Sequence, residues 1–209
     1  MSGTQLTGDR VAAIVPRWEW RVFGRDLPLA RGRLRGALSG PERRSRESYL
    51  LSPESPHNVK IRDGALEVKR LVEVHPSGLE RWRPTLRALF PLDPHLLSEV
   101  WDALRIPPPQ SPIPLNDESG FLDALPQELR VVHLEKRRRP LILRGCPGEW
   151  VMLTVAQLQR QSLALEHPDP ELLLETLRRF HLDPVANTNY PRALAQLAGG
   201  PAPAFSSGA

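Results

Sequence analysis

The stretch that decides the fold runs from Asn58 to Leu71 and reads NVKIRDGALEVKRL. Two short runs of alternating apolar and charged residues flank the pair Asp63-Gly64. Asp-Gly between such runs is a strong hairpin signal, because both residues can take the positive φ that a tight two-residue turn needs. The stretch therefore predicts a β-hairpin with its turn at residues 63 and 64.

The two arms of this hairpin carry their charges on one side. Side chains of a strand point alternately to opposite faces, so Lys60 and Arg62 share a face of the first arm. Glu67 and Lys69 share a face of the second arm in the same way, and the other face is apolar. A polar face usually meets solvent, but it can also line a cavity.

The same period of two recurs along the chain and indicates further strands. The other stretches with alternating charges are 17–21, 47–51, 80–83, 133–139 and 160–166. In the first of them the opposite face carries Trp18 and Trp20, which can form part of a core. Two architectures fit this pattern. One is an antiparallel sheet covered by helices with its polar faces in solvent, and the other is a closed barrel whose polar faces meet inside.

Helical patterns interrupt and follow these strands. Helices are expected at 27–38, 94–104, 118–125 and 170–180. Asp93 can cap the second of them and Pro94 suits its first position. A Pro-rich linker at 106–114 cannot be a helix or a central strand, because proline lacks the backbone donor. Residues 93–127 are therefore predicted to be a helical insertion between two strands of one sheet.

The bulk composition points to one domain and an anionic partner. The chain has 209 residues, a formal net charge of +4 and a pI near 9.8. We expect a single domain at 11–198, with disordered tails at 1–10 and 199–209. Only three of the 28 basic residues are lysines, at positions 60, 69 and 136. All three lie in charged strand-like stretches, which is either chance or a preference for compact point charges such as phosphate sites use.

The single cysteine and the lengths of the apolar runs indicate the cellular compartment. Cys146 can form no intramolecular disulfide and has no metal-site spacing around it, so we interpret it as a small buried residue in a reducing environment. No signal peptide and no apolar run of about 20 residues is present. These features predict a cytoplasmic protein without a membrane segment.

Mixed acids and bases on the polar faces suggest a chemistry if those faces point inward. Basic side chains could neutralise phosphate oxygens, while a few carboxylates hold Mg²⁺ or Mn²⁺. Such a metal would bridge phosphate oxygens and orient a water for attack. An anion would also relieve the repulsion between the bases and so complete the fold.

The order of motifs along the chain resembles that of the CYTH-like, triphosphate tunnel metalloenzyme superfamily. The motifs are WEWRVFG, ESYLLS, NVKIRDGALEVKRL, GLERWRPTL, LEKRRRP, SLALEHPDPE and NTNYPRAL. The resemblance covers nearly the whole chain, from about residue 18 to 197. It implies an α+β fold, an eight-stranded antiparallel β-barrel (a tunnel) with peripheral helices. It also implies a triphosphate or polyphosphate anion as ligand, and hydrolysis or transfer at a terminal phosphate with a divalent metal, Mg or Mn.

The resemblance carries roles onto particular residues. The first-strand signature of the superfamily, Glu-x-Glu-x-Lys, falls on Arg17, Glu19 and Arg21, so the first acid is missing and Glu19 is the candidate catalytic, metal-binding carboxylate. The candidate phosphate-binding residues are Arg21, Lys60, Arg62, Lys69, Arg137 and Arg139. The candidate metal ligands are Glu19, Glu67, Glu135 and Glu166. A further inward carboxylate is expected on the strand at 150–155, which offers none.

Three functional hypotheses follow. The first is a metal-dependent phosphohydrolase acting on tripolyphosphate, polyphosphate or a nucleoside triphosphate. The second is a binding module of the same fold that holds such a ligand without cleaving it, which the missing acids favour. The third, nucleic-acid binding, is the least favoured, because aromatic residues are not interleaved with the basic patches. A homodimer is compatible with the sequence, which does not fix the oligomeric state.

Overall fold

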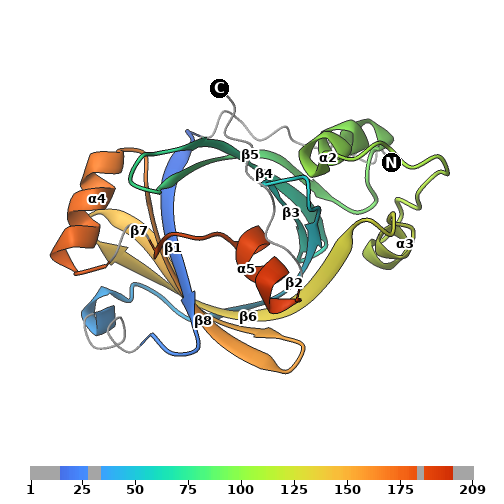
Figure 1. The fold of residues 1–209 in the computed structure, drawn as a ribbon. Coiled ribbons are helices and arrows are strands. Elements are labelled where there is room, and N and C mark those ends of the chain that lie inside the picture. The colour runs from blue at the N-terminus through green and yellow to red at the C-terminus, as the bar shows by residue number, and fades with distance from the viewer. Residues whose placement is uncertain (1–14, 28–33, 183–185, 200–209) are drawn as a thin grey trace, which may run out of the picture.

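The computed structural model describes residues 15–27, 34–182 and 186–199 (Figure 1). Its eight antiparallel strands close into a barrel in the order β1-β5-β4-β3-β2-β6-β7-β8, and β8 pairs back onto β1. The strands are β1 (Arg17–Gly24), β2 (Arg43–Leu51), β3 (Asn58–Arg62), β4 (Ala65–Val74), β5 (Glu80–Leu89), β6 (Arg130–Leu143), β7 (Cys146–Val155) and β8 (Leu158–His167). The predicted fold class is therefore confirmed. Of the two architectures that fit the alternation, the strands form the closed barrel.

The β-hairpin predicted at residues 58–71 is formed by β3 and β4. Asp63 has φ 51° and Gly64 has φ 70°, so both turn residues take the left-handed conformation that Asp-Gly was expected to supply. Arg62 pairs with Ala65 across the turn, and Lys60 lies opposite Glu67. The register places the charged side chains of both arms on the same face of the barrel wall.

The helical segments lie mainly around the barrel. They are η1 (Arg35–Ala37), η2 (Pro94–Leu96), α2 (Leu97–Leu104), α3 (Glu118–Asp123), α4 (Pro170–Arg179) and α5 (Tyr190–Leu197). The segments η2, α2 and α3 lie between β5 and β6 in the chain. Residues 28–33 of the helix expected at 27–38 lie outside the described residues, as do the predicted tails apart from Gly199. None of the helices described is long and apolar enough to cross a membrane.

Two apolar clusters cover the outside of the barrel. The first joins outward residues of β3 and β4, such as Ile61 and Leu66, to Trp101 of α2 and Phe121 of α3. The second joins Trp18 and Trp20 of β1 to α4. Because the apolar faces of these strands are covered by helices, their polar faces point into the barrel.

A third apolar cluster fills part of the barrel interior. It is built around α5, which lies within the ring of strands in Figure 1. Tyr190 of α5 stacks on Tyr49 of β2, with ring centroids 5.2 Å apart. The inward strand residues of the cluster are Tyr49, Leu51, Val132, Leu134, Val151, Leu153 and Val155, with Phe23 partly buried against them. The helix therefore occupies one part of the interior and leaves the polar part as a pocket.

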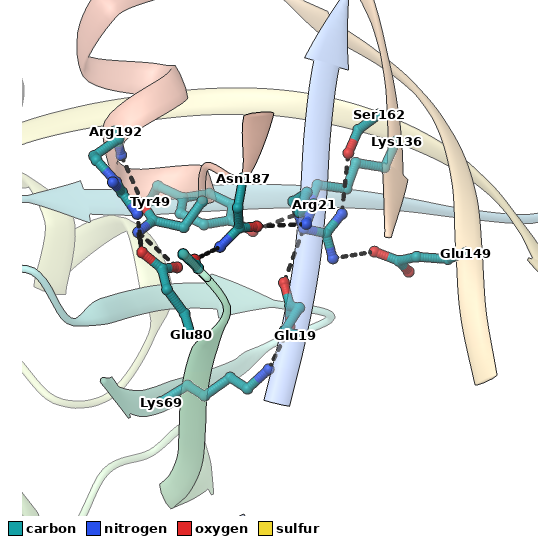
Figure 2. A network of polar contacts seen from close by, with 12 residues as sticks. Glu19, Arg21, Tyr49, Lys69, Glu80, Lys136, Glu149, Ser162, Asn187 and Arg192 are labelled. Carbon is teal, nitrogen blue, oxygen red and sulfur yellow. Dashed lines mark hydrogen bonds and ion pairs between the residues drawn. The ribbon is translucent and has the colours of Figure 1, made fainter. Parts of the chain in front are cut away.

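Polar contacts fix α5 to the wall. Asn189 caps the helix by accepting a hydrogen bond from the backbone N–H of Arg192 at 3.0 Å. Its side-chain amide donates to both carboxylate oxygens of Glu80 on β5 at 3.1 Å, and Arg192 forms an ion pair with the same carboxylate (Figure 2). The sequence did not predict a helix inside the barrel.

Candidate anion-binding pocket

The polar part of the barrel interior is a pocket of about 440 Å³. Its charged lining has seven bases and four acids, so the cavity is electropositive. The bases are Arg21, Lys60, Arg62, Lys69, Arg87, Lys136 and Arg138, and the acids are Glu19, Glu67, Glu149 and Glu166. Tyr49 and Tyr190 also line it, which places the end of α5 at one side of the cavity.

Every lysine of the protein faces this one pocket. Lys60, Lys69 and Lys136 come from β3, β4 and β6, and each ammonium group lies over an aromatic ring. The Lys69 Nζ is 5.7 Å from the centre of the Trp82 ring, and the Lys136 Nζ is 3.4 Å from that of Tyr190. All three lysines of the sequence therefore lie at one cavity.

A buried carboxylate holds two of these lysines together. The side chain of Glu47 on β2 has no exposed surface, and its Oε2 accepts hydrogen bonds from Lys60 Nζ at 3.0 Å and Lys136 Nζ at 2.9 Å. Ser45 Oγ donates to the other oxygen at 3.0 Å, and Lys136 Nζ donates also to the Tyr49 hydroxyl at 2.8 Å. Glu47 therefore positions two ammonium groups at the pocket wall.

Electrostatics keep this carboxylate ionised and weaken the lysines as bases. Burial alone would raise the pKa of Glu47, but the charges of Lys136 and Lys60 outweigh it and hold that pKa well below its ordinary value. Burial lowers the pKa of Lys60. Burial, with repulsion from Lys60, lowers the pKa of Lys136 well below that of an ordinary lysine.

Arg21 of β1 is the centre of a second charged group, shown in Figure 2. Its guanidinium donates to Glu19 at 2.9 Å, to Glu149 at 2.9 Å and to the Ser162 hydroxyl at 3.1 Å. Glu19 accepts in turn from Lys69 Nζ at 2.8 Å. Burial opposes ionisation of Glu19, but Lys69 and Arg21 together lower its pKa to about 2.

The β3–β4 hairpin supplies a third charged group. Glu67 Oε1 lies 2.7 Å from Arg62 Nη2 and 3.4 Å from Arg87 Nε, and its Oε2 lies 3.6 Å from Lys60 Nζ. One carboxylate therefore sits among three cationic side chains. The arrangement shows where a phosphate group could meet several donors at once.

Most of the predicted site residues come together in this pocket. The lining includes Glu19, Arg21, Lys60, Arg62, Glu67, Lys69 and Glu166. The roles proposed for them, as phosphate-binding or metal-binding groups, remain predictions. Their meeting in one cavity shows that period-two alternation placed β1, β3, β4 and β8 correctly relative to the interior.

Three predicted residues of β6 lie outside the pocket instead. Arg137 pairs with Glu42 at 2.9 and 3.1 Å with its side chain 56% exposed, and Glu135 pairs with Arg46 at 3.1 Å. Arg139 lies on the same outer face, so the prediction of which face of this strand points inward was wrong.

The reason for this error is the helix inside the barrel. The inner face of β6 begins with Val132 and Leu134, which pack against α5, and only then presents Lys136 and Arg138 to the pocket. On β6, the inner face is therefore the one whose first residues are apolar. The polar alternation through His133 belongs to the face that meets solvent.

Three interior acids were not among the predicted site residues, and one of them is Glu80, which binds Asn189 and Arg192 at the start of α5. Glu149 lines the pocket from β7, one residue before the segment in which an inward carboxylate was expected and not found. Glu47 lies behind the lysines. The signal for Glu149 was available, because it continues inward the alternation of Val151, Leu153 and Val155.

The carboxylates do not fit a divalent-metal site. Within the described parts of the chain, no three His, Cys, Asp or Glu side chains are grouped so that they could hold a metal ion. Glu166 lies opposite Glu19 in the β1–β8 register, but its carboxylate accepts a hydrogen bond at 2.8 Å from Arg17, the residue at the position of the missing acid. Built-in cations thus bond both oxygens of Glu19 and one oxygen of Glu166, and Mg²⁺ or Mn²⁺ would have to compete with them.

Comparison with known proteins adds structural neighbours only. No protein-family model and no curated protein matches the sequence. A putative adenylyl cyclase from Hippeastrum, described as having a dominant triphosphatase activity, is 12% identical over 91% of this chain and 98% of its own, with a TM-score of 0.48. A conserved hypothetical protein from Pyrococcus furiosus is 14% identical over 79% and 91%, with a TM-score of 0.46.

A further neighbour has the same level of similarity. A putative adenylate cyclase from Bacillus halodurans is 12% identical over 88% of this chain and 98% of its own, with a TM-score of 0.42. The closed eight-stranded barrel is the fold that the resemblance to the CYTH-like superfamily implied. The chemistry of the pocket is interpreted from the residues of this chain.

Proposed function

We propose that the barrel binds a triphosphate or polyphosphate anion in its basic pocket. The observation that carries this proposal is the convergence of all three lysines and four arginines on one cavity. Lysine and arginine donate charge-assisted hydrogen bonds to phosphate oxygens, and several such donors in a concave site favour a ligand with several negative charges. A volume of about 440 Å³ lies within the range of roughly 300–1,000 Å³ for small-molecule sites.

The distribution of the bases favours a chain-like anion over a single phosphate. Arg62 and Arg87 meet around Glu67, Lys60 and Lys136 meet at Glu47, and Lys69 and Arg21 meet at Glu19. These three groups are spread along different strands of the wall. A ligand with phosphates in a row can contact more than one group, whereas one phosphate group would satisfy only part of the lining.

Hydrolysis is the second candidate function. The observation that favours it is the register of β1 and β8, which sets Glu19 directly opposite Glu166 at the pocket. Against it stand the ion pairs of both carboxylates with Lys69, Arg21 and Arg17. The geometry therefore supports binding better than a metal-dependent cleavage.

One experiment separates the two functions. Phosphate release from tripolyphosphate and from ATP is measured with Mg²⁺ and with Mn²⁺, alongside binding of the same ligands by calorimetry. We expect binding without release in either metal. Release that disappears in a folded Glu19→Ala variant, but persists in Glu135→Ala, would establish the hydrolase instead. If neither tripolyphosphate nor ATP binds, the pocket has another ligand.

The affinity for tripolyphosphate is expected to depend on pH through the buried lysines. Burial lowers the pKa of Lys60 and of Lys136 below the ordinary value of 10.5. The anion binds the protonated form, so affinity falls as pH rises through the lowered values, and the fall begins before an ordinary lysine would titrate. Binding should then be accompanied by proton uptake, which calorimetry in two buffers of different ionisation enthalpy measures.

The Lys60→Arg variant is the control for this pH dependence. Arginine keeps its charge over the whole range, so the part of the fall in affinity that comes from Lys60 should disappear, while the part that comes from Lys136 remains. An affinity that is constant up to pH 10 in the natural protein would contradict the lowered pKa values of the lysines.

A further inference from the structure

The carboxylates of the pocket act as counter-ions to its bases. Glu67 is 2.7 Å from Arg62, Glu149 is 2.9 Å from Arg21, and Glu19 is 2.8 Å from Lys69. Glu166 is 2.8 Å from Arg17 at the edge of the same cavity. Each of the four lining acids is thus bonded to a cationic side chain of the protein itself.

This arrangement has a consequence for the ionic form of the ligand. A divalent cation arriving with a triphosphate would have to compete with a protein cation for each lining carboxylate, and it would be repelled by a lining in which bases outnumber acids by seven to four. A metal-free triphosphate carries more negative charge than its Mg²⁺ complex. It also leaves its oxygens open to the Lys and Arg donors.

We propose that the pocket takes its phosphate ligand as the metal-free anion, and that the ligand displaces lining carboxylates from their bases. This inference rests on the proposed binding function and specifies the ligand species. Triphosphate or the end of a longer polyphosphate enters without Mg²⁺. Its oxygens replace carboxylate oxygens as acceptors for the protein cations.

Glu67 is the carboxylate whose displacement the geometry points to. It belongs to the hairpin of β3 and β4, and it neutralises Arg62, Arg87 and Lys60 together. Once Glu67 is displaced, Arg62 and Arg87 can meet one phosphate group, with Lys60 beside them on its hydrogen bond to Glu47. Glu47 is different, because it is fully buried behind the lysines and keeps them in position.

The test is a calorimetric titration of the full chain with tripolyphosphate under two conditions. One buffer contains EDTA, and the other contains Mg²⁺ in excess over the ligand, with ionic strength matched by NaCl so that screening is equal. We expect binding in EDTA and an affinity at least about tenfold weaker in Mg²⁺, because the cation removes ligand charge and gains no protein ligand. An affinity that rises with Mg²⁺, or binding that requires it, overturns the inference.

A variant of Glu67 gives a second test. The change in affinity for tripolyphosphate has one sign if Glu67 competes with the ligand for the bases and the opposite sign if Glu67 binds a metal. Glu67→Gln removes a competing negative charge and keeps the shape of the side chain, so tripolyphosphate in EDTA should bind several-fold more tightly. If Glu67 instead held a metal that bridges to the ligand, the same variant would bind more weakly than the natural protein in the Mg²⁺ buffer. Glu135→Gln, which makes the same change on the outer face, should leave the affinity unaltered.

The failure of this inference and that of the proposed function give different results. Binding only with Mg²⁺ leaves a phosphate-binding barrel and contradicts the metal-free ligand. Absence of binding in both buffers, with the protein folded by circular dichroism, contradicts the binding function and the inference that rests on it.

Discussion

Replacement of Lys60 and Lys69 by alanine together is expected to weaken tripolyphosphate binding by about 1,000-fold. Each lysine supplies a charge-assisted hydrogen bond in a partly desolvated cavity, which contributes roughly 1.5–3 kcal/mol, and every 1.4 kcal/mol is tenfold in affinity. The variant should still fold, because Glu47 keeps Lys136 and Glu19 keeps Arg21 as partners. Calorimetry of the natural and double-variant proteins measures the change.

A matched control removes the same charge from the other side of the wall. The double variant Arg137→Ala with Arg139→Ala also loses two positive charges, but both side chains lie on the outer face of β6. We expect its affinity to change by less than about threefold, because exposed charges act on the pocket only through screened long-range attraction. If the outer pair cost as much as the lysine pair, the ligand would bind outside the barrel.

Glu47→Ala is expected to destabilise the fold by about 3–5 kcal/mol. Removal of one partner of a buried ion pair leaves the other charge without compensation, and here two ammonium groups lose the same carboxylate. Arg138, whose guanidinium is 3.7 Å from Glu47, loses a neighbouring charge as well. The free energy of unfolding, obtained from denaturant titration at neutral pH, measures the effect.

The comparison for this variant is Glu135→Ala, which removes an acid from the neighbouring strand. Glu135 forms an ion pair with Arg46, but the two side chains are 65% and 89% exposed. Exposed ion pairs contribute little, so the change should stay within about 0.5 kcal/mol. Equal and small losses for the two variants would mean that Glu47 is not the counter-ion that holds the lysines in place.

The hairpin and the strands could be predicted because their information is local. Asp63 and Gly64 determine a turn through their own φ preferences, and alternation along β1, β3, β4 and β8 determines which residues share a face. Alternation cannot say which of the two faces points inward. That choice depends on what covers the sheet, and the helices α2 and α4 cover it from the outside.

The errors on β6 have a non-local cause. Whether Lys136 or Arg137 points inward depends on α5, a segment more than fifty residues later in the chain that packs against Val132 and Leu134 from inside the barrel. No periodicity within β6 contains that contact. The same limit applies to Glu47, whose role depends on lysines from two other strands.

Residue usage and the motifs both pointed to residues that line the pocket. The chain uses arginine at nearly every basic position, yet its three lysines come from three strands to one cavity. The superfamily signature placed Glu19 and Arg21 in the pocket but also implied a metal, which the ion pairs of Glu19 and Glu166 oppose. The position of the missing acid, Arg17, marks where this chain departs from that pattern.

The same three lysines report directly on whether the anion enters the barrel. Protein labelled with ¹³C only in lysine should give three ε-methylene signals, all from the pocket wall. Addition of tripolyphosphate in EDTA is predicted to shift all three signals, with Lys60 and Lys69 responding most because their side chains are more exposed than that of Lys136. If the three signals stay unmoved at millimolar tripolyphosphate, the anion does not enter the barrel, which contradicts the proposed binding function.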